Sequence, residues 1–194
     1  MSTVQTLKLN ETPVRTSRNF RINNVLLENV TVPENVREFD HMTIQCDGSN
    51  VEINQKASNV ELVYGISQEL VEMLNQKANQ KIKVNVDGNT DEISKVVIDY
   101  VFDAENTELL DNIEICVNAN QKATIIIKYR VEDEVAYFHH GVIRLNAGEG
   151  ASVNVIVVNY LNSNSTHLMN MQNEFAPNSN VKYTLVDFGG KSSI

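Results

Sequence analysis

The chain has no tryptophan and few of the residues that crosslink or interrupt small folds. It contains two cysteines, three prolines and eight glycines in 194 residues. Cys46 and Cys116 form neither the C-x-x-C spacing of a metal site nor a dense disulfide framework, which indicates reduced thiols and a cytoplasmic protein. The lack of tryptophan disfavours a groove that stacks sugar rings.

Long apolar runs and positive charge are also scarce. No stretch approaches the ~18 apolar residues of a membrane span, and the start MSTVQTLKLNETPVRT lacks the apolar core of a signal peptide. Lys and Arg total 16 against 25 Asp and Glu, which gives a formal net charge of -9. We therefore expect neither nucleic acid nor a membrane as a partner, because binding to phosphates needs clustered basic side chains.

A pattern that returns three times near the C-terminus is the strongest positive feature of the sequence. Each copy consists of an apolar strand, a small-residue corner and a second strand: NIEICVNANQKATIIIKYR, GVIRLNAGEGASVNVIVVNY and MQNEFAPNSNVKYTLVDF. We align the corners on Ala119, Ala147 and Pro177, which spaces them 28 and then 30 residues apart. A unit of this length cannot bury its own apolar face, so the repeat predicts copies stacked around a shared interior.

Alternation within the second strands identifies the face that is buried. One face carries Ile125 and Ile127, then Val153 and Val155, then Tyr183 and Leu185. Such alternation is typical of half-buried strands, and the spacing leaves no room for crossover helices. We predict an all-β fold, a parallel β-helix with coils of about 28 to 30 residues. An antiparallel meander or sandwich is the alternative, disfavoured because the corners lack Asn-Gly or Asp-Gly pairs.

The N-terminal part differs in pattern. Residues 1–60, with a basic and then alternating segment between Pro13 and Pro33, are predicted to form an irregular arm. Residues 61–194 are predicted to hold one short helix and an incomplete β-helix, and the whole chain is expected to form one structural domain.

One helix and two strands are expected between the arm and the repeats. Residues 67–79 place an apolar stripe behind Ser67, a suitable N-cap. Strands are predicted over 81–86 and 95–102, separated by the turn Asp87-Gly88-Asn89. Val96 lies 28 positions before Thr124, so the second strand would begin a first, irregular coil.

Few residues are candidates for chemistry. In the alignment above Cys116 stacks with Arg144 and Glu174, and a neighbouring guanidinium would lower the pKa of the thiol and make it reactive. An ordinary surface ladder with an ion pair is the favoured interpretation. Cys46 lies in a turn, QCDGSN, and is expected to be incidental.

The histidines and acidic residues give equally weak signals. His139 and His140 are adjacent, so on a strand they face opposite sides and cannot share a metal. We expect His139 to pack inward with a hydrogen bond, and a metal pair between His140 and His167 is the less favoured hypothesis. The run Glu132-Asp133-Glu134 is predicted to be a solvated loop rather than a calcium site.

Several stretches together resemble the SufB/SufD family of the SUF iron-sulfur cluster assembly system. They are TPVRTSRNFRINNVLL, KATIIIKYR and FHHGVIRLNAGEGASVNVIVVNYLNSNSTHLMNMQNEFAPNSNVKYTLVDFGG, and the resemblance, to the N-terminal half of the family, covers most of residues 12 to 190. It implies a right-handed parallel β-helix that acts as a scaffold, not an enzyme. The implied partners are a SufB/SufD paralogue and the ABC-type ATPase SufC.

The resemblance also limits which roles can be assigned. In the family, the positions linked to cluster building and the surface that docks the ATPase lie in later segments, beyond Ile194 here. No catalytic, cofactor-binding or metal residue is therefore assigned, and no cofactor is expected on this chain alone, although the family is associated with iron-sulfur clusters. An open coil end predicts self-association or pairing with a related chain.

Two functions from other classes are the alternatives. A β-helical polysaccharide-active enzyme would need paired carboxylates along a groove, and a β-rich structural or adhesion module would need no SUF partner. No G-x-S-x-G or phosphate-binding glycine motif supports an enzyme.

Overall fold

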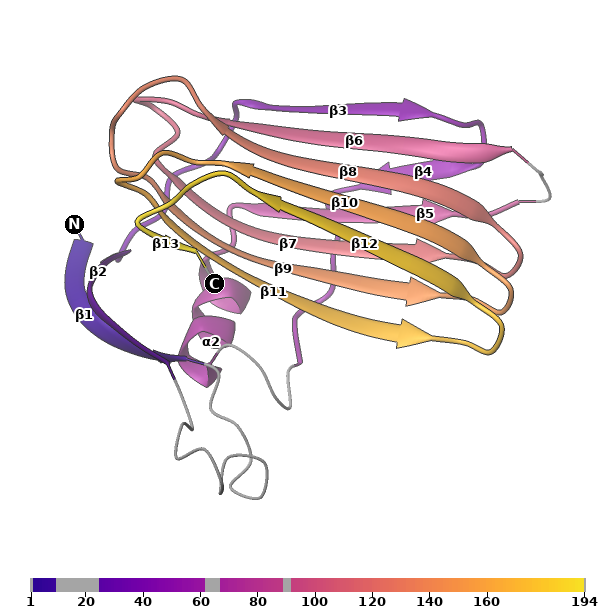
Figure 1. Ribbon diagram of the computed structural model, residues 1–194, viewed down its shortest axis with the longest axis horizontal. Coiled ribbons are helices and arrows are strands. Elements are labelled where there is room, and N and C mark those ends of the chain that lie inside the picture. Colours follow the sequence, from indigo (N-terminus) through magenta and orange to yellow (C-terminus); the bar gives the residue numbers. More distant parts are fainter. Residues whose placement is uncertain (1, 10–24, 62–66, 89–91, 194) are drawn as a thin grey trace, which may run out of the picture.

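The computed structural model describes residues 2–9, 25–61, 67–88 and 92–193. Within this part, most strands belong to two sheets that face each other across a shared interior (Figure 1). Residues 1 and 10–24 of the expected arm, and Asn89 of the expected turn, lie outside the described residues.

The first sheet contains β3 (Met42–Asp47), β6 (Ile93–Phe102), β8 (Lys122–Val131), β10 (Ser152–Tyr160) and β12 (Asn180–Asp187). The second contains β4 (Val51–Asn54), β5 (Gln80–Val86), β7 (Glu108–Val117), β9 (Phe138–Ala147), β11 (Thr166–Phe175) and β13 (Ser192–Ser193). Outside these sheets, β1 (Ser2–Leu9) pairs with β2 (Val25–Pro33), and α2 spans Gln68–Lys77.

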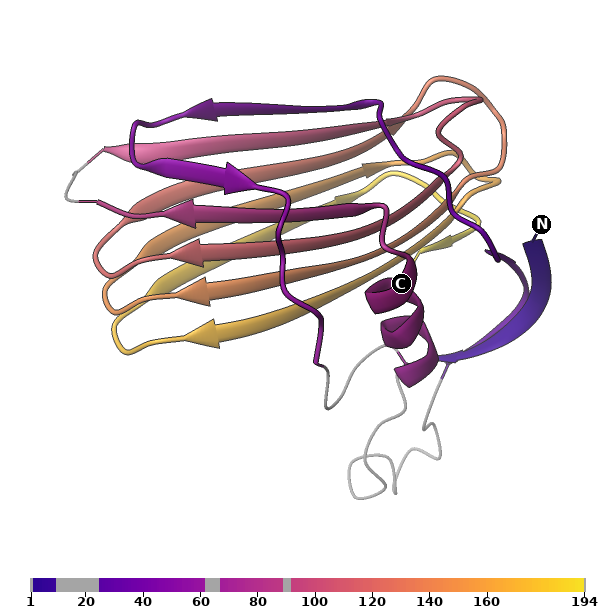
Figure 2. The ribbon, with the colours of Figure 1, turned by 180° about the vertical axis from the view of Figure 1, so that it is seen from behind.

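The chain alternates between the two sheets, and equivalent strands of successive coils are parallel. In the first sheet β6, β8, β10 and β12 pair in parallel, and in the second sheet β5, β7, β9, β11 and β13 do so. In Figure 1 the strands β8, β10 and β12 of the first sheet lie in front and run to the left, whereas β7, β9 and β11 of the second sheet lie behind and run to the right. Successive coils lie lower in this view, so the path is a right-handed coil (Figures 1 and 2). The predicted parallel β-helix is confirmed, and the antiparallel meander is not the fold.

The spacing of the coils differs from the sequence alignment. Val117 pairs with Ala147 and Ala147 with Phe175, so the first spacing is 30 residues and the second is 28. The alignment had these in the reverse order, which displaces lateral partners by two positions. Val96 pairs with Ile125, not with Thr124, so that part of the alignment was displaced by one residue and set inward-facing Val96 level with an outward-facing residue. Among the three repeat copies the inward face was identified correctly, because a shift of two residues keeps every side chain on its own side of the sheet.

The interior, here called the lumen, is filled by the inward side chains of both sheets. Fully buried apolar residues recur on the strands from β5 to β10, and they include Ile82, Val96, Ile98, Ile113, Ile115, Ile125, Ile127, Ile143, Leu145 and Val155. The inward side chains of β11 and β12, such as Met169 and Val181, are partly buried. Branched side chains suit the pleated surface of a strand, and burial of each contributes about 1.5 to 3 kcal/mol. This continuous core holds the two sheets together.

The N-terminal end of the lumen is closed by a reversed coil. Strand β3 pairs antiparallel with β6, and β4 pairs antiparallel with β5. Between them Gly48 adopts a φ of 141°, a conformation that favours glycine. The segment predicted as an irregular arm is thus more regular than expected, since its described residues contain four strands, β1 to β4. The division of the chain at residue 60 into two parts of one domain stays a prediction.

Helix α2 and the β1–β2 pair cover the outer face of the second sheet where its strands begin (Figure 2). Ser67 caps α2 by accepting a hydrogen bond from the backbone N–H of Leu70, as predicted. Leu70 and Leu74 pack against outward-facing Leu110, Val142 and Leu168 in a second core. This cover leaves the farther part of the outer face accessible.

Candidate functional site

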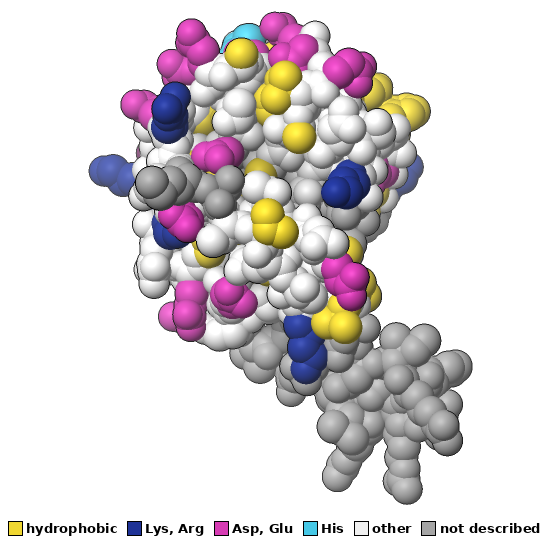
Figure 3. All heavy atoms as spheres, turned by 90° about the vertical axis from the view of Figure 1, so that its left-hand side faces the viewer, with side chains coloured by type: hydrophobic (Ala, Val, Ile, Leu, Met, Phe, Trp, Pro, Cys, Tyr) yellow, Lys and Arg dark blue, Asp and Glu magenta, His cyan; other side chains and the backbone are white. Residues whose placement is uncertain are grey.

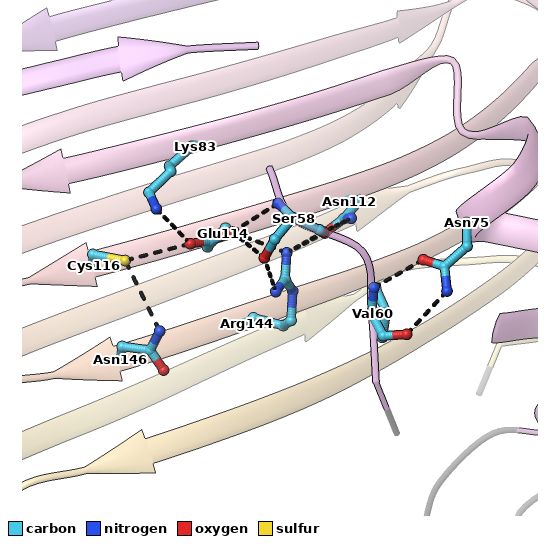
Figure 4. Close-up of polar contacts among 9 residues, drawn as sticks. All are labelled: Ser58, Val60, Asn75, Lys83, Asn112, Glu114, Cys116, Arg144 and Asn146. Atoms are coloured by element: carbon cyan, nitrogen blue, oxygen red, sulfur yellow. Dashed lines mark hydrogen bonds and ion pairs between the residues drawn. The ribbon is translucent and has the colours of Figure 1, made fainter. Parts of the chain in front are cut away.

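Two polar clusters lie on opposite sides of the second sheet, one outside and one in the lumen. The outer cluster is centred on Glu114 of β7 (Figure 4). Its carboxylate accepts hydrogen bonds from the backbone N–H and hydroxyl of Ser58, at 2.9 and 2.8 Å, and forms ion pairs with Lys83 at 2.7 Å and Arg144 at 3.1 Å. Burial alone would raise the pKa of Glu114, but Lys83, Ser58 and Arg144 together lower it to about 2.

This outer cluster fastens the connector that follows β4 to the coils. Arg144 also donates to the hydroxyl and carbonyl oxygens of Ser58, and the Asn112 side chain donates to the same carbonyl. Farther along the connector, Asn75 of α2 exchanges two hydrogen bonds with the backbone of Val60 (Figure 4). The cluster therefore has a structural role, since its charges are satisfied by one another and by the connector.

Glu114→Gln is expected to lower the free energy of unfolding by about 3 kcal/mol at neutral pH, since each pKa unit is worth about 1.4 kcal/mol. The pKa of Glu114 falls from 4.5 to about 2 on folding, so its contribution is complete above pH 4.5 and is lost as the pH falls through 2. Urea unfolding of both proteins at pH 7, 4 and 3 measures this, and the difference should shrink with acidification. Glu52→Gln on the exposed face of β4 is the control, and a difference independent of pH would contradict the prediction.

Cys116 does not stack with Arg144. Its lateral partner is Asn146, which in turn pairs with Glu174, whereas Arg144 pairs with Glu114. The predicted ladder was wrong because the alignment was displaced by two residues at this coil. Burial raises the pKa of Cys116, and this outweighs the opposing contacts with Asn146 and Lys83. The structure therefore gives no support for an activated thiol.

Cys46 lies on β3 rather than in a turn, and its thiol is exposed. Burial and the adjacent Asp47 raise its pKa. Because Cys46 belongs to the first sheet and Cys116 to the second, the two thiols do not form a pair of ligands for one metal. Of the acidic run, Asp133 accepts hydrogen bonds from the Val135 N–H and the Tyr137 hydroxyl, which accounts for it as part of a loop.

The second cluster lies in the lumen and joins three strands of the second sheet. His139 Nε2 lies 2.8 Å from Asp111 Oδ1, and His139 Nδ1 lies 2.7 Å from His167 Nδ1. The Tyr129 hydroxyl, from the first sheet, donates to Asp111 Oδ2 at 2.9 Å. We call these four residues the lumen chain; Asp111, His139 and Tyr129 are fully buried. His139 thus packs inward with a hydrogen bond, as predicted.

Glycine makes room for the lumen chain. Gly141 lies beside Asp111 in the sheet, and a Cβ atom at this position would lie 2.0 Å from Asp111 Oδ1 and 2.8 Å from His139 Nε2. The backbone of Gly141 has no unusual conformation, so the requirement is for space alone. A side chain of any size would displace the carboxylate from His139.

His140 points the other way, as expected for adjacent strand residues. It is buried under α2, where its Nε2 lies 3.1 Å from the Leu70 carbonyl oxygen. Burial lowers the pKa of His140 to about 4, and His139 adds to this effect. The hypothesis of a metal pair between His140 and His167 is wrong, because they lie on opposite faces of the sheet. It is His139 that meets His167.

The lumen chain ends at a cavity of about 230 Å³. This cavity is here called the end cavity, and it is lined by His167, Met169 and Met171 of β11 and by Val157, Asn159, Leu185, Val186 and Asp187 of the first sheet. Burial lowers the pKa of His167 to about 2, with a further effect from His139, so the imidazole is neutral at physiological pH. A neutral imidazole has one ring nitrogen with a lone pair, which can accept a hydrogen bond or bind a metal.

Asp111 and Tyr129 were missed by sequence reasoning. The available signal was the alternation of inward and outward positions along the strand. Asp111 occupies an inward position between Leu109 and Ile113, where an acidic residue needs buried partners. Within the described ranges, no group of three or more His, Cys, Asp or Glu residues is placed to hold a metal ion. No helix of this part of the chain is long and apolar enough to cross a membrane.

Comparison with known proteins connects the regular coils to a family. Residues 100–194, from the end of β6 onward, match the family model described as "SUF system FeS cluster assembly, SufBD core domain". No curated protein and no solved structure matches the chain. The match covers the coils from β7 to β13, whereas β5 and most of β6 precede it. It agrees with the resemblance noted in the sequence. The coils of residues 100–194 are therefore assigned to the SufBD core domain of the SUF system of iron-sulfur cluster assembly.

Proposed function

We propose that the chain is a non-enzymatic scaffold component of iron-sulfur cluster assembly in the cytoplasm. It acts in a complex with a SufB/SufD paralogue or a second copy, together with the ABC-type ATPase SufC. The observation that carries this proposal is the coincidence of the family match, residues 100–194, with the parallel coils. The cluster is cargo of the complex rather than a resident cofactor, in keeping with two cysteines on different sheets.

The outer strands of the coil stack support pairing with a related chain. Strand β12 has one neighbour, β10, and β13 covers only the Thr166 and His167 positions of β11. Phe175, Leu185 and Phe188 near these edges are each more than half exposed, at 52%, 59% and 65%. Unpaired strand edges with apolar side chains favour addition of another sheet.

The surface does not favour anionic partners. On the face shown in Figure 3, acidic, basic and apolar side chains are interspersed, and no continuous basic patch forms among the described residues. With a net charge of -9, the chain is not suited to nucleic acid or to an anionic membrane.

Co-purification from the host with analysis of iron and sulfide tests the proposal. We expect a tagged chain to bring down a paralogue and SufC, with iron and sulfide in the complex. Phe175→Lys with Leu185→Lys should release these partners, whereas the matched pair Val4→Lys with Leu26→Lys, exposed on β1 and β2, should retain them. A lone, colourless monomer, or polysaccharide cleavage that yields reducing ends, would overturn the proposal.

A further inference from the structure

The cover of the second sheet, formed by α2 and the β1–β2 pair, has a core of its own (Figure 2). Its inward side chains pack against Leu110, Val142 and Leu168 on the outer face of the sheet. The lumen is filled by a different set of residues. Because the two cores are separate, the cover can open locally while the coils stay folded.

His140 lies in this second core, between the sheet and α2. Its side chain is fully buried, and its lateral partners on the neighbouring coils are Leu110 and Leu168. Nε2 lies 3.1 Å from the carbonyl oxygen of Leu70 on α2. A carbonyl oxygen can only accept a hydrogen bond, so Nε2 carries the hydrogen and Nδ1 holds the lone pair. Nδ1 is buried and has no hydrogen-bond partner among the described residues.

The charged side chains of the elements around His140 point elsewhere. Those of the cover are exposed, and so is the one near the end of β11: Lys8 on β1, Glu28 on β2, Glu69, Glu72 and Lys77 on α2, and Glu174 on β11. On the same face of the sheet, Glu108 lies level with Phe138, while Glu114 and Arg144 form the outer cluster. Within the part of the chain that the structure describes, His140 has no ion pair, so a proton added to Nδ1 would lack a carboxylate partner in this core.

Burial has the largest effect on the pKa of His140 and lowers it, and His139 on the lumen side adds to this. Asp111 in the lumen and the nearby backbone act in the opposite direction. The balance is a pKa of about 4 while the cover is closed. His167, the other ionisable group on the lumen side, is held neutral by its own burial.

Opening of the cover returns His140 to water, where the pKa of an imidazole is about 6.5. The closed form is therefore favoured most above pH 6.5, and this advantage is lost as the pH falls from 6.5 to about 4. Relative to pH 7, acidification should raise the equilibrium constant for opening by about threefold at pH 6 and about 20-fold at pH 5.

The C-terminal end of α2 is fastened by hydrogen bonds that the other end lacks. The side chain of Asn79 accepts from the backbone N–H of Leu110 and donates to the carbonyl oxygens of Glu108 and Arg37. The Leu70 end is held to the sheet by apolar contacts and by the histidine ring. Opening should therefore begin at the Leu70 end and pivot at Asn79.

We propose that His140 is an acid-sensitive latch, whose protonation at Nδ1 releases the cover from the second sheet and exposes Leu110, Val142 and Leu168. The proton adds from solvent while the cover is open, and it keeps the cover open because closing would bury the charge. Access to this apolar face then depends on pH. The inference does not depend on the proposed scaffold function.

Hydrogen–deuterium exchange of the full chain at pH 7, 6 and 5, corrected for the intrinsic exchange rate at each pH, tests the latch. Between pH 7 and 5 we expect exchange of α2 and β2 amides to rise by about 20-fold, while amides of β8 and β10 stay protected. In His140→Phe the rise should fall below about threefold, because phenylalanine fills the site and cannot take up a proton. His41→Phe is the matched control: this side chain is 42% exposed, so the variant should keep the full rise.

Nitrogen-15 NMR of the parent chain tests the same latch without a variant. At pH 7 the His140 ring should be neutral, with its hydrogen on Nε2. A rise in α2 exchange that persists in His140→Phe would overturn the proposal, as would loss of protection in β8 and β10 at the same pH as in α2. A His140 ring with its hydrogen on Nδ1, or one that is already charged at pH 7, would overturn it too. Loss of SUF partners would leave all these results unaffected.

Discussion

Asp111→Ala is expected to lower the free energy of unfolding by about 3 to 5 kcal/mol, because removal of one member of a buried pair leaves its partners without compensation. His139 Nε2 and the Tyr129 hydroxyl would each lose their acceptor, and both side chains are fully buried. An unsatisfied buried donor costs about 1 to 3 kcal/mol. Urea unfolding at neutral pH, followed by circular dichroism, measures the change.

Two variants show whether the effect comes from burial of this pair. Asp99→Ala removes the partner of Arg130, an ion pair at the sheet surface where the arginine side chain is 43% exposed. We expect it to cost no more than about 1 kcal/mol. Tyr129→Phe removes one donor and leaves the His139 contact, so it should cost about 1 kcal/mol. Equal losses for Asp111→Ala and Asp99→Ala would show that the lumen chain adds nothing to stability.

The repeat made the fold predictable from sequence. Alternation along the second strands identified Ile125, Ile127, Val153 and Val155 as inward-facing, and all four are buried. The apolar stripe after Ser67 similarly predicted α2 and its N-cap. Both predictions depend on local periodicity, which a single sequence displays directly.

The residues that lie side by side on neighbouring coils could not be predicted from the sequence in the same way. The corner residues are small and similar, so the sequence fits coil spacings of 28 then 30 residues as well as 30 then 28. Both alignments place the same side chains on the inward face of the strands. Burial therefore cannot distinguish them, because it depends only on the face that a side chain occupies. What decides between them is contact across coils, such as Arg144 with Glu114 and the Ser58 connector. The prediction for Cys116 failed at this step because it required a specific neighbour rather than a specific face.

The reversed coil of β3 and β4 and the lumen chain could not be predicted from the sequence for a related reason. Strands β3 and β4 lie before the repeats and pair with β6 and β5 through tertiary contact, so periodicity of the coils says nothing about them. His139 could be placed inward by parity, but its partners Asp111 and His167 come from two other coils. Sequence therefore predicts which side of a sheet a residue occupies more readily than which residues it meets.

The two polar clusters of the second sheet differ in how their acidic groups are compensated. Outside, the acidic group is neutralised by Lys83 and Arg144 and holds a connector in place. Inside, Asp111 has no Lys or Arg among the partners found in the described residues, and its hydrogen bonds lead through two imidazoles to the end cavity. A buried carboxyl group without a cationic partner is costly to desolvate, so the hydrogen bonds with Tyr129 and His139 have to offset that cost.

Gly141→Ala is expected to destabilise the fold by about 3 kcal/mol, the upper part of the range for overpacking a core. The new Cβ atom would lie 2.0 Å from Asp111 Oδ1, so either the carboxylate or the strand has to move. If the carboxylate is the obstacle, the same substitution should cost only about 1 kcal/mol in an Asp111→Ala background, because the remaining close contact is the flexible edge of the His139 ring.

A double-mutant cycle measures this coupling from four unfolding free energies. Gly150→Ala is the matched control: Gly150 has a φ of 67° at a corner, and the Cβ atom would meet the Asn120 side chain rather than the lumen chain. Its cost should therefore be the same with and without Asp111, as for independent sites. Strict additivity of Gly141→Ala with Asp111→Ala would mean that the space at Gly141 does not serve the carboxylate, and the assignment of this glycine to the lumen chain would be wrong.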